Sequence, residues 1–284
     1  MALQILVDSA SDITPDEAKR LKVVHIPLTV SFGDSQYQDG VNLTHRQFYE
    51  KLIESDTLPM TSQASPAVFQ EVCRPLVEAG DEVVIIALSS QLSGTCQSAC
   101  LAASEFGGRV HVVDSENVCV GERLLVQRAV ELRAQGMGAQ ELVNALNREK
   151  KDIRVLAVLD TLEYLKKGGR VSAAAAFAGG LLSIKPVVTV ADGKVQLCGK
   201  ARGSRNGGNL LRRLIAEGGG VDFTRPYCVA YSGLSDAMLQ KYMDDNADLW
   251  QTHTRALPVY TVGSVIGTHV GPDAIAVAYF EKQV

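Results

Sequence analysis

The segment that decides the fold is Val83-Val84-Ile85-Ile86-Ala87-Leu88-Ser89-Ser90-Gln91-Leu92-Ser93-Gly94-Thr95. Its first six residues form an apolar run, which is typical of a strand buried in a parallel sheet. The next seven residues are rich in hydroxyl groups and lead into a helix that we expect from about Gln97. Such a turn places free backbone N–H groups at a helix start, where an anion binds favourably. The segment therefore predicts a strand, a small-anion site and a helix.

A second hydroxyl-rich segment, Thr61-Ser62-Gln63-Ala64-Ser65-Pro66, also precedes an expected helix. Ser65 is a suitable N-cap, and Pro66 suits the first helical position. Neither segment contains an acidic, basic or metal-ligating side chain. Together the two segments predict a site that binds a small anion, and they give no direct indication of bond cleavage.

The first half of the chain alternates strand and helix patterns, as parallel sheets flanked by helices do. The expected strands and helices of this half are Leu3–Val7, Val23–Phe32, a helix from Thr44, Pro66–Ala79, Val83–Leu88, Gln97–Phe106, Arg109–Val113, Val120–Gln135 and Ala139–Lys150. We expect Ser11 or Asp12 to cap a helix that begins at Thr14-Pro15. This order predicts an N-terminal three-layer domain with a parallel sheet.

The pattern changes near residue 154. Asp160 and Glu163 predict the start of a short helix that ends at Gly168-Gly169, and an alanine-rich helix is expected over Ser172–Phe177. Ala191-Asp192-Gly193 then separates two extended segments, as in a β-hairpin. We therefore predict an α/β chain of two domains, residues 1–153 with the parallel sheet and residues 154–284 with an α+β fold and a mixed sheet.

Composition and charge exclude several classes of protein. Of the 284 residues, 46% are hydrophobic and 21% are charged, which is ordinary for a globular protein. A net charge of −4 argues against general affinity for nucleic acid. The N-terminal residues lack the pattern of a signal peptide, and no run approaches the ~20 apolar residues of a spanning helix. These features predict a cytoplasmic protein.

Positive charge is concentrated between Thr161 and Gly220, where ten Lys and Arg residues accompany three Asp and Glu residues. Such a window is either a solvated face or a docking surface for an acidic partner or a phosphate.

The six cysteines include no C-x-x-C pair, so buried free thiols are expected. Cys96 and Cys100 lie four residues apart, which leaves a metal pair as an alternative.

Three further segments combine turn residues with chemically active side chains. Asp8-Ser9-Ala10-Ser11-Asp12 follows the first strand, at the edge of the sheet where ligands bind in open α/β folds. Arg170 follows Gly168-Gly169, either at a site or as a solvated residue after a helix cap. His269 lies in the glycine-rich segment 263–272, for which we expect a ligand-facing loop. The other four histidines have no comparable setting.

In this order, the segments resemble those of the DegV proteins, the fatty-acid-binding subunits of bacterial fatty acid kinase. Gln91 and Cys96 depart from the family pattern, where glycine and tyrosine are common. The resemblance covers the whole chain and is carried by Val7–Asp12, Thr61–Pro66, Leu88–Thr95, Val113-Asp114-Ser115, Leu165–Ser172, Ile184-Lys185-Pro186 and Gly267–Pro272.

The resemblance implies that a long-chain fatty acid lies between the two domains. It implies a carboxylate held by the two hydroxyl-rich turns, with an arginine and a histidine near its opening. The residues that match these positions are Thr61, Ser62, Ser93, Gly94, Thr95, Arg170 and His269. A separate ATP-binding fatty acid kinase subunit then converts the bound acid to an acyl phosphate. The resemblance also implies transient membrane contact, with no metal and no cofactor.

Two other functions are compatible with the residues. A serine acyl hydrolase would use Ser93 as nucleophile, His269 as base and Asp8 or Asp114 to orient the base. The chain lacks the G-x-S-x-G motif that such hydrolases carry. A regulator that binds phosphate or a nucleotide is the third hypothesis, because helix-start turns suit phosphate equally well.

Overall fold

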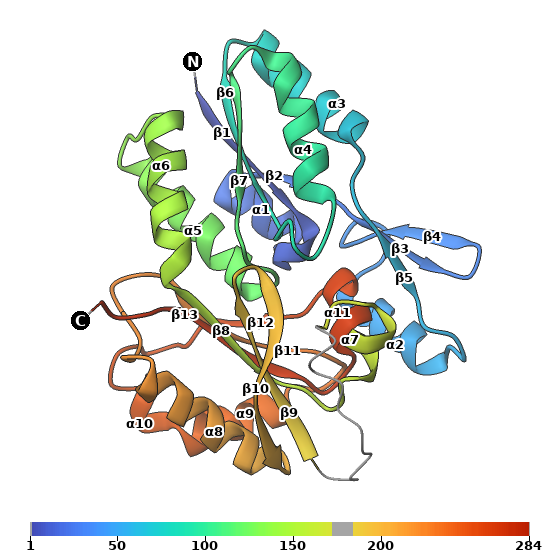
Figure 1. Ribbon diagram of the computed structural model, residues 1–284, viewed down its shortest axis with the longest axis vertical. Helices are drawn as coiled ribbons and strands as arrows, with labels where there is room; N and C mark the ends of the chain where they lie inside the picture. The colour runs from blue at the N-terminus through green and yellow to red at the C-terminus, as the bar shows by residue number, and fades with distance from the viewer. Residues whose placement is uncertain (1, 172–183, 284) are drawn as a thin grey trace.

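The computed structural model describes residues 2–171 and 184–283, so the helix expected over 172–177 lies outside the described residues. Two main sheets and a small third sheet form the framework, and helix α5 lies between the two main sheets (Figure 1). No helix in this described part has the length and apolar character needed to cross a bilayer.

The first main sheet is entirely parallel, as predicted. Its strand order is β2-β1-β6-β7. Helices α3 and α4 pack on one face, and α5 and α6 pack on the other (Figure 1). The elements of this layer structure are β1 (Leu3–Asp8), α1 (Pro15–Leu21), β2 (Val24–Ile26), α3 (Pro66–Glu78), β6 (Glu82–Ala87), α4 (Thr95–Ala103), β7 (Val110–Asp114), α5 (Val120–Ala134) and α6 (Ala139–Glu149).

The second main sheet is mixed, with the strand order β10-β9-β8-β13-β11-β12. Only the β11–β12 pair is parallel. Helices α8, α9 and α10 cover the face that points away from α5 (Figure 1). The elements here are β8 (Ile153–Val158), α7 (Glu163–Lys167), β9 (Ile184–Ala191), β10 (Lys194–Arg202), α8 (Ser204–Glu217), β11 (Tyr227–Tyr231), α9 (Ala237–Asp245), α10 (Ala247–Trp250), β12 (Val259–Thr261) and β13 (Ile275–Phe280).

The hairpin β9–β10 confirms the turn predicted at Asp192-Gly193. Both turn residues have positive φ, 50° and 73°, as a two-residue type I′ turn requires. The turn reaches from the mixed sheet to the parallel sheet, where the Ser89 hydroxyl donates to the Gly193 carbonyl at 2.7 Å. The hairpin therefore closes over the hydroxyl-rich loop after β6.

A small antiparallel sheet of order β4-β3-β5 lies beside helices α2 and α11. Its strands are β3 (Thr29–Phe32), β4 (Ser35–Gln38) and β5 (Met60–Ser62), and the two helices are α2 (His45–Glu54) and α11 (Ser264–Val270). Two expectations are corrected here. Thr61 and Ser62 belong to a strand rather than a turn, and the segment around His269 is a helix rather than a loop.

Two expected helix caps are also wrong. Helix α1 is capped by Thr14, which shares a capping box with Glu17, rather than by Ser11 or Asp12. At α7, the Asp160 carboxylate pairs with Lys185, and the Thr161 hydroxyl accepts the Glu163 N–H at 3.2 Å. In each case a neighbouring threonine supplies the acceptor, Thr14 in place of Ser11 or Asp12 and Thr161 in place of Asp160.

All six cysteines are free, and four of them are buried as expected. Cys100 and Cys198 are exposed. Within the described residues, no group of three or more His, Cys, Asp and Glu side chains could hold a metal ion.

Helix α5 joins the two main sheets into one core. Residues Val120 to Val126 are buried without interruption. The helix packs against β1 and β6 on one side and against β8, β11 and β13 on the other. One hydrophobic cluster accordingly contains Ile5 of the parallel sheet, Leu125 of α5 and Ala278 of the mixed sheet.

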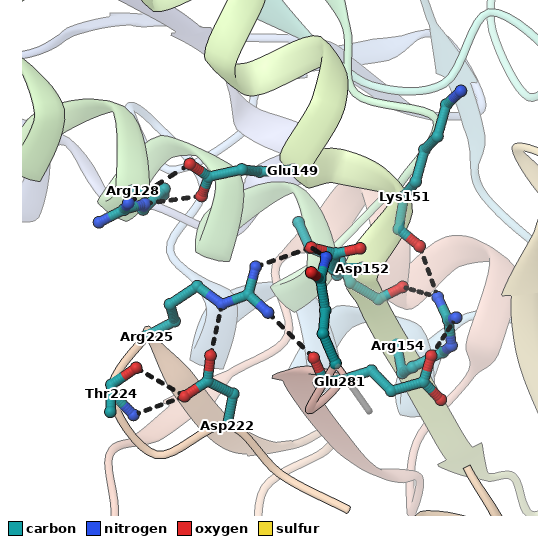
Figure 2. Close-up of polar contacts among 11 residues, drawn as sticks. Arg128, Glu149, Lys151, Asp152, Arg154, Asp222, Thr224, Arg225 and Glu281 are labelled. Carbon is teal, nitrogen blue, oxygen red and sulfur yellow. Dashed lines mark hydrogen bonds and ion pairs between the residues drawn. The ribbon is translucent and has the colours of Figure 1, made fainter. Parts of the chain in front are cut away.

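An ion-pair network fastens the segment after β13 to the turn between α6 and β8 (Figure 2). The Arg225 guanidinium donates to Asp222 at 2.7 Å, to Asp152 at 2.8 Å and to the Glu281 carbonyl at 2.9 Å. Arg154 pairs with the Glu281 carboxylate. The segment after β13 is thus held against the turn that connects α6 to β8.

Candidate functional site

A cavity of about 350 Å³ lies where the parallel sheet, the small sheet and α11 meet. Its volume falls within the ~300–1,000 Å³ range of small-molecule sites. Six of the seven residues predicted for the site line this cavity: Thr61, Ser62, Ser93, Gly94, Arg170 and His269. The sequence segments that carry them are far apart, so the fold has gathered them at one place.

Two hydroxyl groups of the cavity, those of Thr61 and Ser93, each have a side-chain hydrogen-bond partner. The Thr61 hydroxyl lies 3.0 Å from Nε2 of His269. The Ser93 hydroxyl lies 3.0 Å from the Thr95 hydroxyl and accepts the Thr95 N–H at 3.2 Å. Thr95, the seventh predicted residue, is fully buried and lies behind Ser93 rather than on the cavity wall.

Gly94 is required by the close approach of Gln63. A Cβ atom at position 94 would lie 2.0 Å from Oε1 of Gln63. The Gln63 amide is fixed from the other side, where it donates to the Ser98 hydroxyl at 3.1 Å. Gln63 also lines the cavity, although we assigned it no role from the sequence. Gln63 lies inside the segment Thr61–Pro66, and this position in the sequence could have identified it as a site residue.

His269 is held on the last turn of α11. Burial and the positive charge of Arg170 lower the pKa of His269 to about 4, so the imidazole is neutral at neutral pH. Its Nδ1 atom is buried and has no hydrogen-bond partner among the described residues. A Cβ atom at Gly168 would lie 2.2 Å from this nitrogen, so the glycine makes room for the ring.

Arg170 lines the same cavity, although we expected it to lie outside with His269, near the opening. Its guanidinium donates from Nε to the Leu92 carbonyl at 3.3 Å and from Nη1 to the Gly168 carbonyl. These bonds hold the arginine over the loop that carries Ser93. Among the described residues that line the cavity, Arg170 has the one permanent charge, and none is a carboxylate.

A neighbouring apolar space of about 60 Å³, the apolar extension, borders this cavity. The two spaces share the side chains of Val118, Leu165, Val195, Ile266 and Val270. The extension is lined further by β8, β9 and β13 of the mixed sheet, through Val155, Ala157, Val188 and Ala276 among others. The site therefore has a polar end near the parallel sheet and an aliphatic end at the mixed sheet.

The geometry does not support a serine acyl hydrolase. His269 is bonded to Thr61, and Ser93 is bonded to Thr95. The Asp8 carboxylate accepts the N–H groups of Ala10 and Leu88, and Asp114 accepts those of Ser90 and Glu116. Both aspartates therefore hold backbone turns and do not orient the histidine.

Comparisons with known proteins identify the family of this chain. The family described as "Uncharacterised protein, DegV family" matches residues 2–282. A DegV domain-containing protein of Deinococcus radiodurans is 37% identical over 282 residues, which cover 98% of each chain.

Solved structures of DegV proteins share the fold. A fatty-acid-binding DegV family protein from Thermus thermophilus superposes with a TM-score of 0.87, at 34% identity over 99% of this chain and 100% of that one. DegV of Bacillus subtilis, a fatty acid binding protein, superposes with a TM-score of 0.83, at 27% identity over 99% of this chain and 100% of that one. Family match, sequence relatives and solved structures coincide over the full length, and the chain belongs to the DegV family.

Proposed function

We propose that this chain binds a long-chain fatty acid. The observation that carries the proposal is the contrast between two spaces that share five wall residues. The cavity has hydroxyl and backbone groups, and the apolar extension has aliphatic side chains. The carboxylate would lie among Thr61, Ser62, Ser93 and Gly94, and the alkyl chain would extend toward β8, β9 and β13. The fatty acids bound by the Thermus and Bacillus relatives support the same assignment.

The free energies favour such a ligand. Burying about 15 methylene groups at ~0.8 kcal/mol each contributes roughly 12 kcal/mol before the costs of association. Removing the carboxylate from water opposes binding by several kcal/mol. Hydroxyl and backbone donors offset that cost without a fixed charge in direct contact, which leaves the carboxylate reactive.

The neutral state of His269 fits this role. With its proton on Nε2, the imidazole donates to the Thr61 oxygen, 3.0 Å away. The Thr61 hydroxyl is then free to donate its own proton to a carboxylate. In this tautomer His269 orients Thr61 as a donor, and the low pKa of the histidine keeps the ring uncharged at neutral pH.

We further propose that the bound acid is presented to a separate ATP-binding kinase subunit, which forms the acyl phosphate in the cytoplasm. The chain has no G-x-x-x-x-G-K-[ST] loop of its own. Arg170 lies on the cavity wall, where a positive charge stabilises the phosphorylated product and its transition state more than the free acid. In this proposal the chain is a lipid carrier without turnover of its own.

The test is the content of the purified protein. The chain is produced in a bacterial host, denatured, extracted with solvent, and the extract is analysed by mass spectrometry. We expect a long-chain fatty acid at about one per chain. Folded protein that carries no acyl chain, and that takes none up from a fatty-acid titration, would contradict the proposal. A bound nucleotide or phosphate in its place would favour the regulator hypothesis.

A further inference from the structure

The buried turn from Asp8 to Asp12 bonds to segments that form the cavity, although none of its residues lines the cavity. The Asp8 carboxylate accepts the Leu88 N–H at 2.9 Å, and the Ser9 hydroxyl oxygen accepts the Leu28 N–H at 3.0 Å. Leu88 and Leu28 are both cavity residues. Two side chains of the turn thus fix two stretches of the wall.

The same turn also holds two segments from later in the chain. The Ala10 carbonyl accepts the Cys119 N–H at 2.8 Å, and Cys119 lines the apolar extension. Oδ1 of Asp12 accepts the Gly263 N–H at 2.8 Å. Gly263 directly precedes α11, the helix that supplies Val265, Ile266 and His269 to the cavity.

A side chain at Gly263 would force its neighbours to shift. A Cβ atom there would lie 2.9 Å from Nε2 of His45 and 3.0 Å from Oδ1 of Asp12. Asp39 adds a second support, because its Oδ1 accepts the Ser264 N–H at 3.1 Å. The first turn of α11 is therefore fixed by two buried carboxylates.

Helix α11 transmits that support to the polar end of the site. Ser264 and His269 are five residues apart, or about 7.5 Å along a helix. At the far end, Nε2 of His269 lies 3.0 Å from the Thr61 hydroxyl, and the ring packs against Gly168, where a Cβ atom would lie 2.2 Å from Nδ1. A small tilt at Gly263 therefore displaces the imidazole and admits water to it.

We propose that Asp8, Ser9 and Asp12 are positioning residues of the fatty-acid site, and that Asp12 sets the position of His269 through α11. The inference rests on the proposed function for its effect on ligand affinity, but its effect on His269 is independent of any ligand. Burial of these carboxylates supports it, since a buried carboxyl without such a task is costly to a fold.

The experiment measures two quantities on each variant. The first is the pKa of His269 in the ligand-free protein, from the imidazole NMR resonances. The second is the affinity for a long-chain fatty acid such as oleate. The variants are Asp12→Ala, Asp12→Asn, Ser9→Ala and Gly263→Ala. Asp16→Asn is the control, because Asp16 lies on the surface of α1 and pairs only with Lys19 in the described structure.

Each variant has a distinct expected result. In Asp12→Ala and Gly263→Ala, the pKa of His269 rises from about 4 toward 6.5, and affinity falls about tenfold. Asp12→Asn keeps an acceptor oxygen for Gly263 and preserves both quantities. Ser9→Ala weakens affinity several-fold and leaves the His269 pKa unchanged, because Ser9 supports Leu28 and not α11.

A native His269 pKa in folded Asp12→Ala or folded Gly263→Ala overturns the inference. Should Asp12→Ala fail to fold, Gly263→Ala and Ser9→Ala still decide it, since each acts on a separate wall. A pKa that rises equally in Ser9→Ala and Asp12→Ala also contradicts it, because that pattern indicates general loosening. If the wild type binds no fatty acid, the proposed function fails while the His269 titration remains decisive for Asp12.

Discussion

The parallel sheet and the mixed sheet contribute to the cavity in different ways. The parallel sheet contributes the carboxyl ends of its strands, called its edge below. There β1 and β6 end and lead into Asp8–Asp12 and Ser89–Thr95. The mixed sheet contributes its face, through side chains of β8, β9 and β13. Backbone N–H groups become free where strands end, whereas on a sheet face they are already paired. An edge is therefore suited to a carboxylate, and a face to an alkyl chain.

The register of the mixed sheet shows how its face makes room for a chain. Ala157 of β8 lies opposite Ala276 of β13, which lies opposite Ala230 of β11. Directly opposed residues share one face of a sheet. Ala157 and Ala276 line the apolar extension and give it space, and Ala230 belongs to the core that packs around α5.

Arg170 is the strongest test of this difference between the two sheets. It lies in the part of the chain that forms the mixed sheet, but it lines the polar end of the site. We expect Arg170→Ala to leave fatty-acid binding close to wild type and to slow phosphorylation by the partner kinase about 100-fold or more. A fatty-acid titration beside a kinase-coupled assay measures both. Lys167→Ala, three residues earlier, is the control. An equal loss of binding and phosphorylation would make the arginine a ligand anchor.

The edge of the parallel sheet is tested by removing its hydroxyls. Ser93→Ala and Thr61→Ala should each weaken binding by roughly 1.5–3 kcal/mol, because each removes a donor from a desolvated anion. The loss should be the same for short and long acyl chains. Ser90→Ala, on the exposed part of the same loop, is the control. Native affinity in the Thr61/Ser93 double variant would place the carboxylate elsewhere.

The face of the mixed sheet is tested by filling its space. Ala157→Leu adds three carbon atoms to the apolar extension and displaces that length of alkyl chain. We expect affinity for an 18-carbon acid to fall by about 2 kcal/mol and affinity for a 12-carbon acid to stay near wild type. Competition binding with both acids measures this, and Ala216→Leu on exposed α8 is the control. An equal loss of affinity for the 12-carbon and 18-carbon acids would contradict the assignment of the alkyl chain to the face of the mixed sheet.

The buried carboxyls beside the polar end are tested through stability rather than through ligand binding. Burial raises the pKa of Asp12 to about 7, well above the value of an unfolded chain. The protonated form thus stabilises the fold below about pH 4, and this contribution is lost as the pH rises through about 7. The free energy of unfolding of Asp12→Asn, relative to wild type, should therefore rise with pH, by at most about 1.4 kcal/mol per pH unit.

Urea unfolding at several pH values between about 4 and 7 measures that difference. Asp16→Asn should show none of this rise. A difference that stays flat over this range, or falls slightly at its acid end, would mean that Asp12 is ionised throughout in the folded protein and would contradict the prediction.

Sequence reasoning succeeded where the signal is local. Structure is determined by a few adjacent residues in three places: the apolar run of β6, the hydroxyl-rich loop after it and the Asp192-Gly193 turn. The prediction of a loop around His269 was wrong for a physical reason. The segment 263–272 holds three glycines and several β-branched residues, which favour a loop when taken alone. Asp12 and Asp39, more than 220 residues earlier, accept the first N–H groups of α11 and stabilise the helix.

The site residues show the same limit. Thr61 and Ser93 were predicted because hydroxyl clusters beside helix starts indicate anion binding. The direct bond between Thr61 and His269 could not be predicted, because it depends on how a three-residue strand packs against a two-turn helix. The proposed division into residues 1–153 and 154–284 stays a prediction, although the mixed sheet does begin with β8 at Ile153.

Helix α5 has a consequence for how the molecule folds. Because its buried residues pack against both main sheets at once, neither sheet can bury its inner face until the helix is in place. The two sheets therefore gain their stability together, and the chain should unfold in one cooperative step rather than half by half. A recombination event that exchanged one sheet for that of a distant relative would have to bring a matching α5 with it.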